Sequence, residues 1–292
     1  MNITRFDVET WIKTVATGEF HYTKVCGLKA RLEPSQDNKL RGIMYELCHS
    51  EKPCCESIGR RDGYYRPIQE GFEIVHWQEA NPNIGFPIIL PFDLRKYVWI
   101  DPNTVIIFAG SKSAGKTGAL YRVVALNMNG VRVKLLSNME GGEPQMRRRF
   151  DAMDIEIPEP APFEVLHITE NFHDAITEPD TIYVIDYIDA PEGSDFYLIG
   201  AMITKVRRKL RNSVAVIGLQ KPFGRDLAFG KEQTLKDAAL YVAMEANKIK
   251  IVDAKVAANK KLHPKNMQWT FQFDPNGEGT NFSNIVPSYE EG

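Results

Sequence analysis

Apolar residues are spaced differently in two parts of the chain. Over residues 85–273, short runs rich in Val and Ile alternate with helical stretches such as 195–212. Runs that are apolar at successive positions are typical of strands buried on both faces, and intervening helices connect parallel strands. We therefore predict an α/β domain with a mostly parallel sheet. Its expected strands span residues 105–109, 131–137, 164–168, 181–185, 213–219, 249–254 and 268–273.

The first 84 residues follow another pattern, three helical stretches and then a hairpin. Apolar residues recur at helical spacing over 8–16, 22–32 and 35–49. Two short strands are expected around Asp62-Gly63, because this dipeptide favours tight turns between antiparallel strands. The order of these elements is that of a winged helix, so we expect a small winged-helix-like module over residues 1–84.

The expected hairpin is basic. In a winged helix that binds DNA, the third helix enters the major groove and the hairpin meets phosphates. Arg60, Arg61 and Arg66 lie on the hairpin and are the candidate phosphate contacts. A module for protein contact or oligomerisation, with these arginines in solvent, is the alternative.

Two polar stretches mark the limits of the α/β part. Residues 78–91 are rich in Pro, Gly and Asn and indicate a boundary, because such composition is typical of loops. Residues 274–279 open a tail, 274–292, that ends in acidic residues. Chain ends are the usual places of disorder, so we expect this tail to be mobile.

The first expected strand leads directly into Gly110-Ser111-Lys112-Ser113-Ala114-Gly115-Lys116-Thr117. This segment fits the pattern G-x-x-x-x-G-K-[ST] at every position, and a helical pattern follows it as that pattern requires. Its glycines let backbone N–H groups turn toward phosphate oxygens, and the helix N-terminus adds positive potential. Lys116 is placed to reach the β- and γ-phosphates, and the Thr117 hydroxyl to bind Mg²⁺. The sequence predicts a site for ATP with Mg²⁺.

Two acidic groups are expected beside the phosphates, because each follows an apolar strand. One strand ends at Asp186, which we assign to the hydrated Mg²⁺ in preference to Asp189. Another is followed by Glu140, our candidate for activating the attacking water, with Glu143 as the alternative. A helix-capping or exposed acid is the other role open to these glutamates.

A glutamine and a mixed loop follow a further strand. Gln220 is placed to sense the γ-phosphate and to relay its loss to residues 221–231. That loop combines basic side chains with Gly and Phe, a composition suited to backbone phosphates and bases. We expect Lys221, Arg225 and Lys231 to contact nucleic acid. The alternative is an ordinary surface loop whose phenylalanines pack on their own domain.

Composition excludes some classes of protein but does not indicate a function. The 292 residues include 36 Lys and Arg, 38 Asp and Glu and 43% hydrophobic residues, which is ordinary for a globular protein. No apolar run reaches the roughly 18 residues of a membrane span, and no signal-peptide pattern opens the chain, so we expect a cytoplasmic protein without membrane contact. The four cysteines lack the spacing of a metal site and are expected to be free thiols.

Together these patterns resemble the RecA-like motor domain of DnaB-type replicative helicases, and most of all the shorter RecA-family ATPases of phages and prophages. The resemblance covers residues 86–273. It rests on the phosphate-binding pattern, Ser137-Asn138-Met139-Glu140, Val184-Ile185-Asp186 and Gly218-Leu219-Gln220, in the family's order and spacing. It implies a RecA-like P-loop fold and a cytoplasmic place in a bacterial, archaeal or phage-infected cell.

The resemblance also implies roles for single residues. Lys116, Thr117 and Asp186 match the family's nucleotide and Mg²⁺ positions, and Gln220 matches its sensor glutamine. The family has Glu before Met where this chain has Met139-Glu140, which shifts the catalytic glutamate by one position.

The family completes each site with Lys-x-Arg from the neighbouring subunit. This chain has Lys255-Val256-Ala257, which keeps the lysine and lacks the arginine. Either Lys255 acts alone across the interface, or another residue such as Arg225 substitutes, or catalysis is slow.

We therefore expect nucleic-acid-dependent ATP hydrolysis in DNA replication or recombination, on single- or double-stranded DNA. The expected form is a homo-oligomeric ring or filament with ATP between subunits. One alternative is a clamp or loader without motor action, switched by ATP binding, which the missing arginine favours. Another is a regulatory or defence ATPase whose partner is a protein.

The net charge of −2 conceals two opposite regions. Residues 151–204 hold 13 Asp or Glu and no Lys or Arg, so the rest of the chain has 36 basic against 25 acidic side chains. In a ring or filament, an acidic face on one subunit could meet a basic face on the next and leave other basic groups for nucleic acid. A solvated acidic surface is the alternative.

Overall fold

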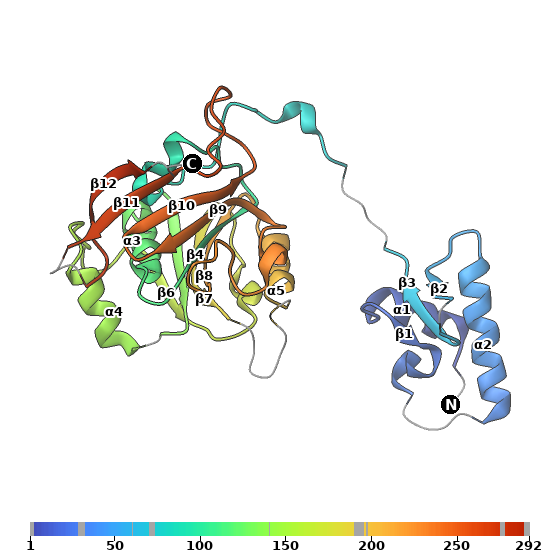
Figure 1. The fold of residues 1–292 in the computed structure, drawn as a ribbon. Coiled ribbons are helices and arrows are strands. Elements are labelled where there is room, and N and C mark those ends of the chain that lie inside the picture. Colours follow the sequence, from blue (N-terminus) through green and yellow to red (C-terminus); the bar gives the residue numbers. More distant parts are fainter. Residues whose placement is uncertain are drawn as a thin grey trace. The chain divides into compact units, whose positions relative to one another are not determined.

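The computed structural model describes residues 3–28, 33–59, 61–69, 74–139, 141–189, 196, 198–274 and 278–288. The chain divides into two compact units, Met1–Ala80 and Asn81–Gly292. Each unit has a hydrophobic core of its own residues. Figure 1 labels the elements of both.

The first unit combines two α-helices with a small sheet. Helix α1 (Arg5–Thr14) begins at a capping box, in which Thr4 and Asp7 bond each other's backbone N–H groups. Helix α2 (Pro34–His49) buries Leu40, Met44 and Leu47 against Val8 and Ile12 of α1. The antiparallel sheet has the order β1-β3-β2, with β1 (Phe20–His21), β2 (Cys55–Ser57) and β3 (Tyr64–Pro67); the 3₁₀ segments of the unit are η1 (Tyr22–Gly27) and η2 (Trp77–Glu79).

The prediction of a helix over residues 22–32 is wrong. Only η1 is helical there, as a kinked 3₁₀ segment, and residues 29–32 lie outside the described part of the chain. The backbone leaves the helical region at Val25 (ψ 140°) and again at Cys26 (φ 55°). Short apolar spacing fits a single 3₁₀ turn as well as an α-helix, so periodicity alone does not separate the two.

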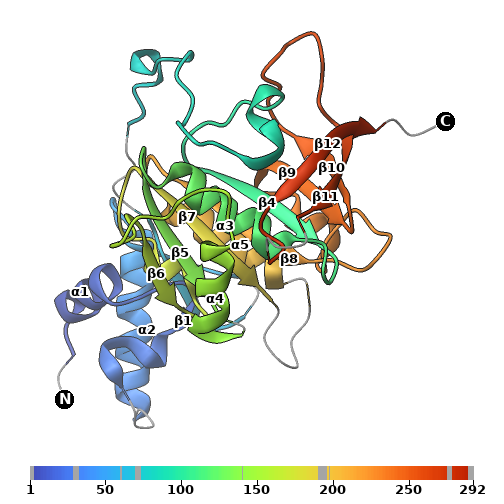
Figure 2. The ribbon, with the colours of Figure 1, turned by 90° about the vertical axis from the view of Figure 1, so that its left-hand side faces the viewer.

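The described residues of the second unit form a nine-stranded sheet with the order β12-β11-β10-β9-β4-β8-β7-β5-β6. Neighbours from β9 to β6 run parallel, and β10, β11 and β12 extend the sheet by antiparallel pairing (Figure 2). The predicted mostly parallel α/β sheet is confirmed. The strands are β4 (Thr104–Gly110), β5 (Arg132–Ser137), β6 (Glu164–His167), β7 (Thr181–Ile188), β8 (Val214–Gln220), β9 (Ala238–Glu245), β10 (Lys248–Ala254), β11 (Gln268–Phe273) and β12 (Phe282–Ser288).

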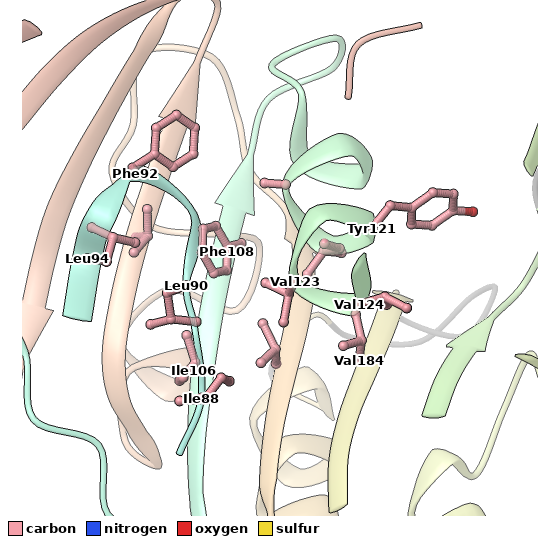
Figure 3. Packing of buried hydrophobic residues seen from close by; sticks show 14 of the residues in the cluster. Ile88, Leu90, Phe92, Leu94, Ile106, Phe108, Tyr121, Val123, Val124 and Val184 are labelled. Carbon is pink, nitrogen blue, oxygen red and sulfur yellow. The ribbon is translucent and has the colours of Figure 1, made fainter. Parts of the chain in front are cut away.

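Alternate strand residues enter two different cores, which is why the strands are apolar at successive positions. Ile106 and Phe108 of β4 face helix α3, whereas Val105 and Ile107 face helix α5. Figure 3 shows the first core, where Ile88, Leu90, Phe92 and Leu94 from the segment before β4 join side chains of β4 and α3.

Short helices cover the two faces of this sheet. Helices α3 (Lys116–Asn127) and α4 (Gly142–Asp151) contribute to one core, and α5 (Leu198–Lys209) to the other. In the described part of the chain, every helix is too short or too polar to cross a bilayer. The 3₁₀ segments of this unit are η3 (Pro91–Lys96), η4 (Phe172–Ala175) and η5 (Lys231–Thr234).

In the second unit, two strands lie where the sequence pattern did not predict them. Strand β9 lies between β4 and β10, although its Ala, Leu, Met and Glu residues are also good helix formers. Strand β12 replaces part of the expected mobile tail, because residues 282–288 pair with the edge of β11. Pro287 is tolerated there, since an edge strand has a side without a neighbour.

Candidate nucleotide-binding site

The carboxyl ends of the parallel strands bring the predicted site residues to one edge of the sheet. The register aligns Gly110 of β4 with Gln220 of β8 and with Met244 of β9. It also aligns Ser137 of β5 with Asp186 of β7. Ligands of open α/β sheets bind outside the carboxyl ends of the strands, so this edge is where a nucleotide is expected.

The P-loop, Gly110–Thr117, curls from the end of β4 into the start of α3. Gly115, the N-cap of α3, has φ 86°, and Ser113 has φ 62°. A Cβ on Gly115 would lie 2.6 Å from the Phe273 ring, so both the backbone turn and the available space require glycine. The N-terminus of α3, whose first N–H groups have no partner within the helix, therefore opens at the loop and attracts anions.

A cavity of about 1350 Å³ lies against the P-loop, large enough for a nucleotide. We call it the P-loop cavity. Nine residues predicted from the sequence line it: the seven residues of 111–117, together with Asp186 and Gln220. Residues of α3, of α4, and of the ends of β5, β7 and β11 with the segments that follow β5 and β11 complete the wall, among them Tyr121, Ser137, Asn138, Gln145, Arg149, Tyr187, Phe273, Asp274 and Glu278.

Hard oxygen donors meet at the start of α3. The Thr117 hydroxyl donates to the Asp186 carboxylate over 3.3 Å, and Asp186 is only 5% exposed. A hydroxyl and a carboxylate at this spacing are the donor types that Mg²⁺ prefers. Beside them, the Lys116 ammonium lies 3.9 Å from the centre of the Tyr187 ring. The residues present therefore fit a magnesium-bound triphosphate.

Tyr121 contributes a hydroxyl that stays protonated at neutral pH. Burial, and then the charge of Asp186, raise the pKa of Tyr121 to about 12. The ring stacks on Phe150 with centroids 4.8 Å apart and planes 5° apart, which holds it in place.

Helix α4 places Gln145 and Arg149 on the same cavity. The sequence shows the basic run at residues 147–149, but its pattern alone does not assign that run to the nucleotide. The spacing of apolar residues along the helix is the sequence signal that could have placed Arg149. Met146 and Phe150 are the buried residues of α4, and Arg149 is next to Phe150 in the sequence.

The 221–231 loop exposes some of its predicted nucleic-acid contacts and buries one. Arg225 and Lys231 are exposed, and Phe223 is 85% exposed. Lys221 is instead 2% exposed and forms an ion pair with Glu245 at the end of β9. Its predicted contact with a phosphate is wrong for this arrangement, because the ammonium is enclosed by its own chain.

None of the remaining candidates, Glu140, Glu143, Asp189 and Lys255, is among the described residues that line the cavity. Glu140 is outside the described residues, although its neighbour Gly141 lines the cavity. Glu143 and Asp189 are exposed, and neither is among the described lining residues. Lys255 is also exposed, and its backbone N–H bonds the Ala239 carbonyl.

The basic hairpin of the first unit is only partly described. Arg60 lies outside the described residues, and Arg61 is exposed with its guanidinium 5.7 Å from the Tyr64 ring centre. Arg66 pairs with Glu56 over 2.5 Å, so its charge is already partly balanced. All four cysteines are free thiols, and Cys48 and Cys55 bring their sulfur atoms to 3.4 Å.

Comparison with known proteins supports the fold. No family model matches the chain, and no curated protein matches it by sequence. A solved DnaB-like replicative helicase, described with its interactions with primase, has a TM-score of 0.51 and 14% identity over 72% of this chain and 66% of that one. The RadB recombinase has a TM-score of 0.45 and 11% identity over 63% of this chain and 92% of that one.

The likeness to the helicase concerns the fold alone, and this chain spans just under two thirds of the helicase. The likeness supports the α/β fold with a mostly parallel sheet that the sequence predicts.

Proposed function

We propose that this protein is a RecA-like ATPase that hydrolyses ATP in response to nucleic acid, in DNA replication or recombination. The observation that carries the proposal is the meeting of Lys116, Thr117, Asp186 and Gln220 on one cavity at the carboxyl edge of the sheet. The ammonium and the hydroxyl come from α3, the carboxylate from β7 and the amide from β8. A bound triphosphate with its metal ion would explain why these four groups meet.

Each residue has a distinct task in the proposed reaction. Mg²⁺ supplies charge neutralisation at the phosphates when bound, and Thr117 and Asp186 are the residues that would hold it. Lys116 and the N-terminus of α3 balance negative charge that develops on the γ-phosphate. Glu140 activates the attacking water, and Gln220 reports loss of the γ-phosphate to the residues that follow it.

The 221–231 loop is the proposed contact with single-stranded nucleic acid. Phe223 offers an exposed ring for a base, and Arg225 and Lys231 offer charges for the backbone. Lys221 is left out of this contact set because it is buried.

The first unit is proposed to be a winged-helix module that meets duplex DNA. The element order α1, β1, η1, α2, β2, β3 and the sheet order β1-β3-β2 support this. Arg60 and Arg61 on the hairpin remain its candidate phosphate contacts, whereas Arg66 already has a partner in Glu56. Protein contact is the alternative use of the same surface.

We also propose that ATP lies between subunits of a ring or filament, with Lys255 reaching the neighbour's site. Lys255 is exposed and is not among the described residues that line its own P-loop cavity, which supports a role on another subunit. The second candidate is an ATP-switched clamp or loader, which the alanine at position 257 favours, because that position carries no second cation.

ATP turnover with and without single-stranded DNA tests the main proposal. We expect a Mg²⁺-dependent turnover that single-stranded DNA raises severalfold. Slow turnover that DNA leaves unchanged would favour the clamp or loader. Absence of binding to single- and double-stranded DNA at low salt would point to a protein partner and reject the DNA proposal.

A matched pair of variants tests the metal assignment. Asp186→Asn removes the buried charge while keeping the shape, so we expect turnover to fall about 100-fold and the Mg²⁺ requirement to rise. Asp189→Asn changes the exposed carboxylate three residues later and is the control. A Mg²⁺ requirement that shifts with Asp189→Asn instead would move the metal site to that residue.

A further inference from the structure

One carboxylate, that of Glu245, bonds both the P-loop and the 221–231 loop. Its Oε2 accepts a hydrogen bond from the Ser111 hydroxyl over 2.7 Å. Its Oε1 accepts one from the Gly224 backbone N–H over 3.0 Å and forms an ion pair with the Lys221 ammonium. Glu245 is the last residue of β9, and it joins segments that are far apart in the sequence.

Lys221 makes this connection costly to break. Its side chain is 1% exposed, and its ammonium also donates to the Arg225 carbonyl over 2.7 Å. A buried ammonium that loses its carboxylate partner is strongly destabilised, so the start of the 221–231 loop must move if Glu245 is removed. Burial raises the pKa of Glu245, but hydrogen bonds from Lys221, Ser111 and Gly224 outweigh it and hold the pKa below its ordinary value, so the carboxylate is charged at neutral pH.

The connection through Glu245 has two sides, which we call the P-loop arm (Ser111) and the loop arm (Lys221 and Gly224), and each leads to a segment of the proposed site. Ser111 is the second residue of the P-loop and lines the P-loop cavity. Lys221 directly follows Gln220, which lines the same cavity. Beyond Gly224 lie exposed residues of the loop, and its far end is held where the Ala228 N–H bonds the buried Tyr241 hydroxyl over 2.8 Å.

We propose that Glu245 is a positioning residue that couples nucleotide binding at the P-loop to the conformation of the 221–231 loop. The inference rests on the proposed nucleotide site and deepens it. A nucleotide shifts the loop only if it interacts differently with two loop arrangements. The Ser111 hydroxyl and Gln220 are the two groups through which that difference reaches Glu245 and Lys221. Both line the P-loop cavity; the Ser111 hydroxyl bonds Glu245, and Gln220 directly precedes Lys221.

Hydrogen exchange of the full chain, with and without Mg²⁺ and a slowly hydrolysed ATP analogue, measures this coupling. In the wild-type protein we expect the analogue to change exchange in peptides covering residues 221–231 by about fivefold or more, the lower end of ordinary coupling between sites. Nucleotide affinity is measured in parallel on the same samples.

Three variants separate the arms. Glu245→Gln removes the charge that pairs with Lys221. Without nucleotide, we expect hydrogen exchange in residues 221–231 to be faster than in the wild type. With nucleotide bound, we expect the nucleotide-dependent change in this exchange to be lost. Ser111→Ala cuts only the P-loop arm, so the loop should start from wild-type exchange and yet respond less to nucleotide. Glu178→Gln is the control, because Glu178 pairs with the buried Lys134 (8% exposed side chain) over 2.5 Å elsewhere in the sheet; its loop should respond as in the wild type.

The outcomes distinguish the two proposals. A wild-type chain that binds no nucleotide rejects the nucleotide site and this inference with it. Nucleotide binding without any change in the loop, or an unaltered change in both Glu245→Gln and Ser111→Ala, overturns the coupling role and leaves the ATPase proposal standing. If Glu245→Gln is poorly folded by thermal unfolding, Ser111→Ala alone decides, since it removes a single hydroxyl.

Discussion

Tyr121 gives the wall of the P-loop cavity a distinct response to pH. Its pKa is raised to about 12 by burial and by the nearby Asp186 charge, whereas a tyrosine in an unfolded chain ionises near pH 10. A pKa that is higher in the folded state contributes stability that is complete below about pH 10 and is lost as the pH rises toward 12.

Tyr121→Phe tests this effect, because it removes the hydroxyl and keeps the ring on Phe150. Over the interval from about pH 10 to 12, the wild type should lose about 2 kcal/mol more free energy of unfolding than the variant. Denaturant unfolding at several pH values measures the difference, and comparison with the variant cancels the other tyrosines. Equal losses in the two proteins would mean that Tyr121 ionises at its ordinary pH.

Lys221 shows that the sequence around a single residue does not determine whether its side chain is buried or exposed. A lysine next to proline and phenylalanine has the composition of an exposed nucleic-acid loop, and Arg225 and Lys231 in the same loop are indeed exposed. The fate of Lys221 depends on Glu245, which lies 24 positions later and at the end of another strand. Burial of an ion pair is decided by which strand ends meet, and that information is not local.

Strands explain why much of the site is predictable. Strands β4, β7 and β8 run through apolar residues into polar ones, so the sequence pattern alone places Gly110, Asp186 and Gln220 at one sheet edge. Strand β9 is made largely of residues that also favour helices, so the pattern predicts neither the strand nor the position of Glu245 at its end. The position of Arg149 depends on which face of α4 packs against the sheet, and a short basic run does not define that face.

Strand β12 is expected to support the P-loop from the side. Phe282 lies 4.8 Å from Phe92 and 5.2 Å from Phe271 between ring centres, and its ring is 3.2 Å from where a Cβ on Gly115 would stand. We expect Phe282→Ala to lower the free energy of unfolding by about 2 kcal/mol, less than for a fully buried ring, and to weaken nucleotide binding.

The control for that change is Ile285→Ala, in the same strand but 41% exposed. It should cost less than about 1 kcal/mol and leave nucleotide affinity unchanged, because it removes few contacts. Denaturant unfolding and nucleotide titration measure both variants. Equal effects of the two substitutions would mean that β12 stabilises the sheet edge without supporting the P-loop.

At the scale of the whole molecule, the uneven distribution of charge along the chain is the feature that the proposed head-to-tail assembly would use. Residues 151–204 carry 13 acidic side chains and no Lys or Arg, and they include β6 at one edge of the sheet. The basic excess elsewhere includes Lys255, which follows β10 in the antiparallel part of the sheet. Opposite charge on different parts of one subunit favours contacts in which unlike surfaces meet, and such contacts close into rings or extend as filaments.

Mixing two inactive variants tests whether Lys255 acts on a neighbour. Lys116→Ala should abolish binding at its own P-loop, and Lys255→Ala should slow hydrolysis at the adjacent subunit's P-loop. In a mixed assembly, a Lys255→Ala subunit retains an intact P-loop that a Lys116→Ala neighbour can complete with its own Lys255. We therefore expect each variant alone to be nearly inactive and the mixture to regain part of the wild-type ATP turnover, to an extent that depends on total protein concentration. Mass measurement of the same samples establishes that the subunits mix. If mixed assemblies form and turnover stays at the level of the separate variants, Lys255 acts within its own chain or not at all, and the site between subunits is rejected.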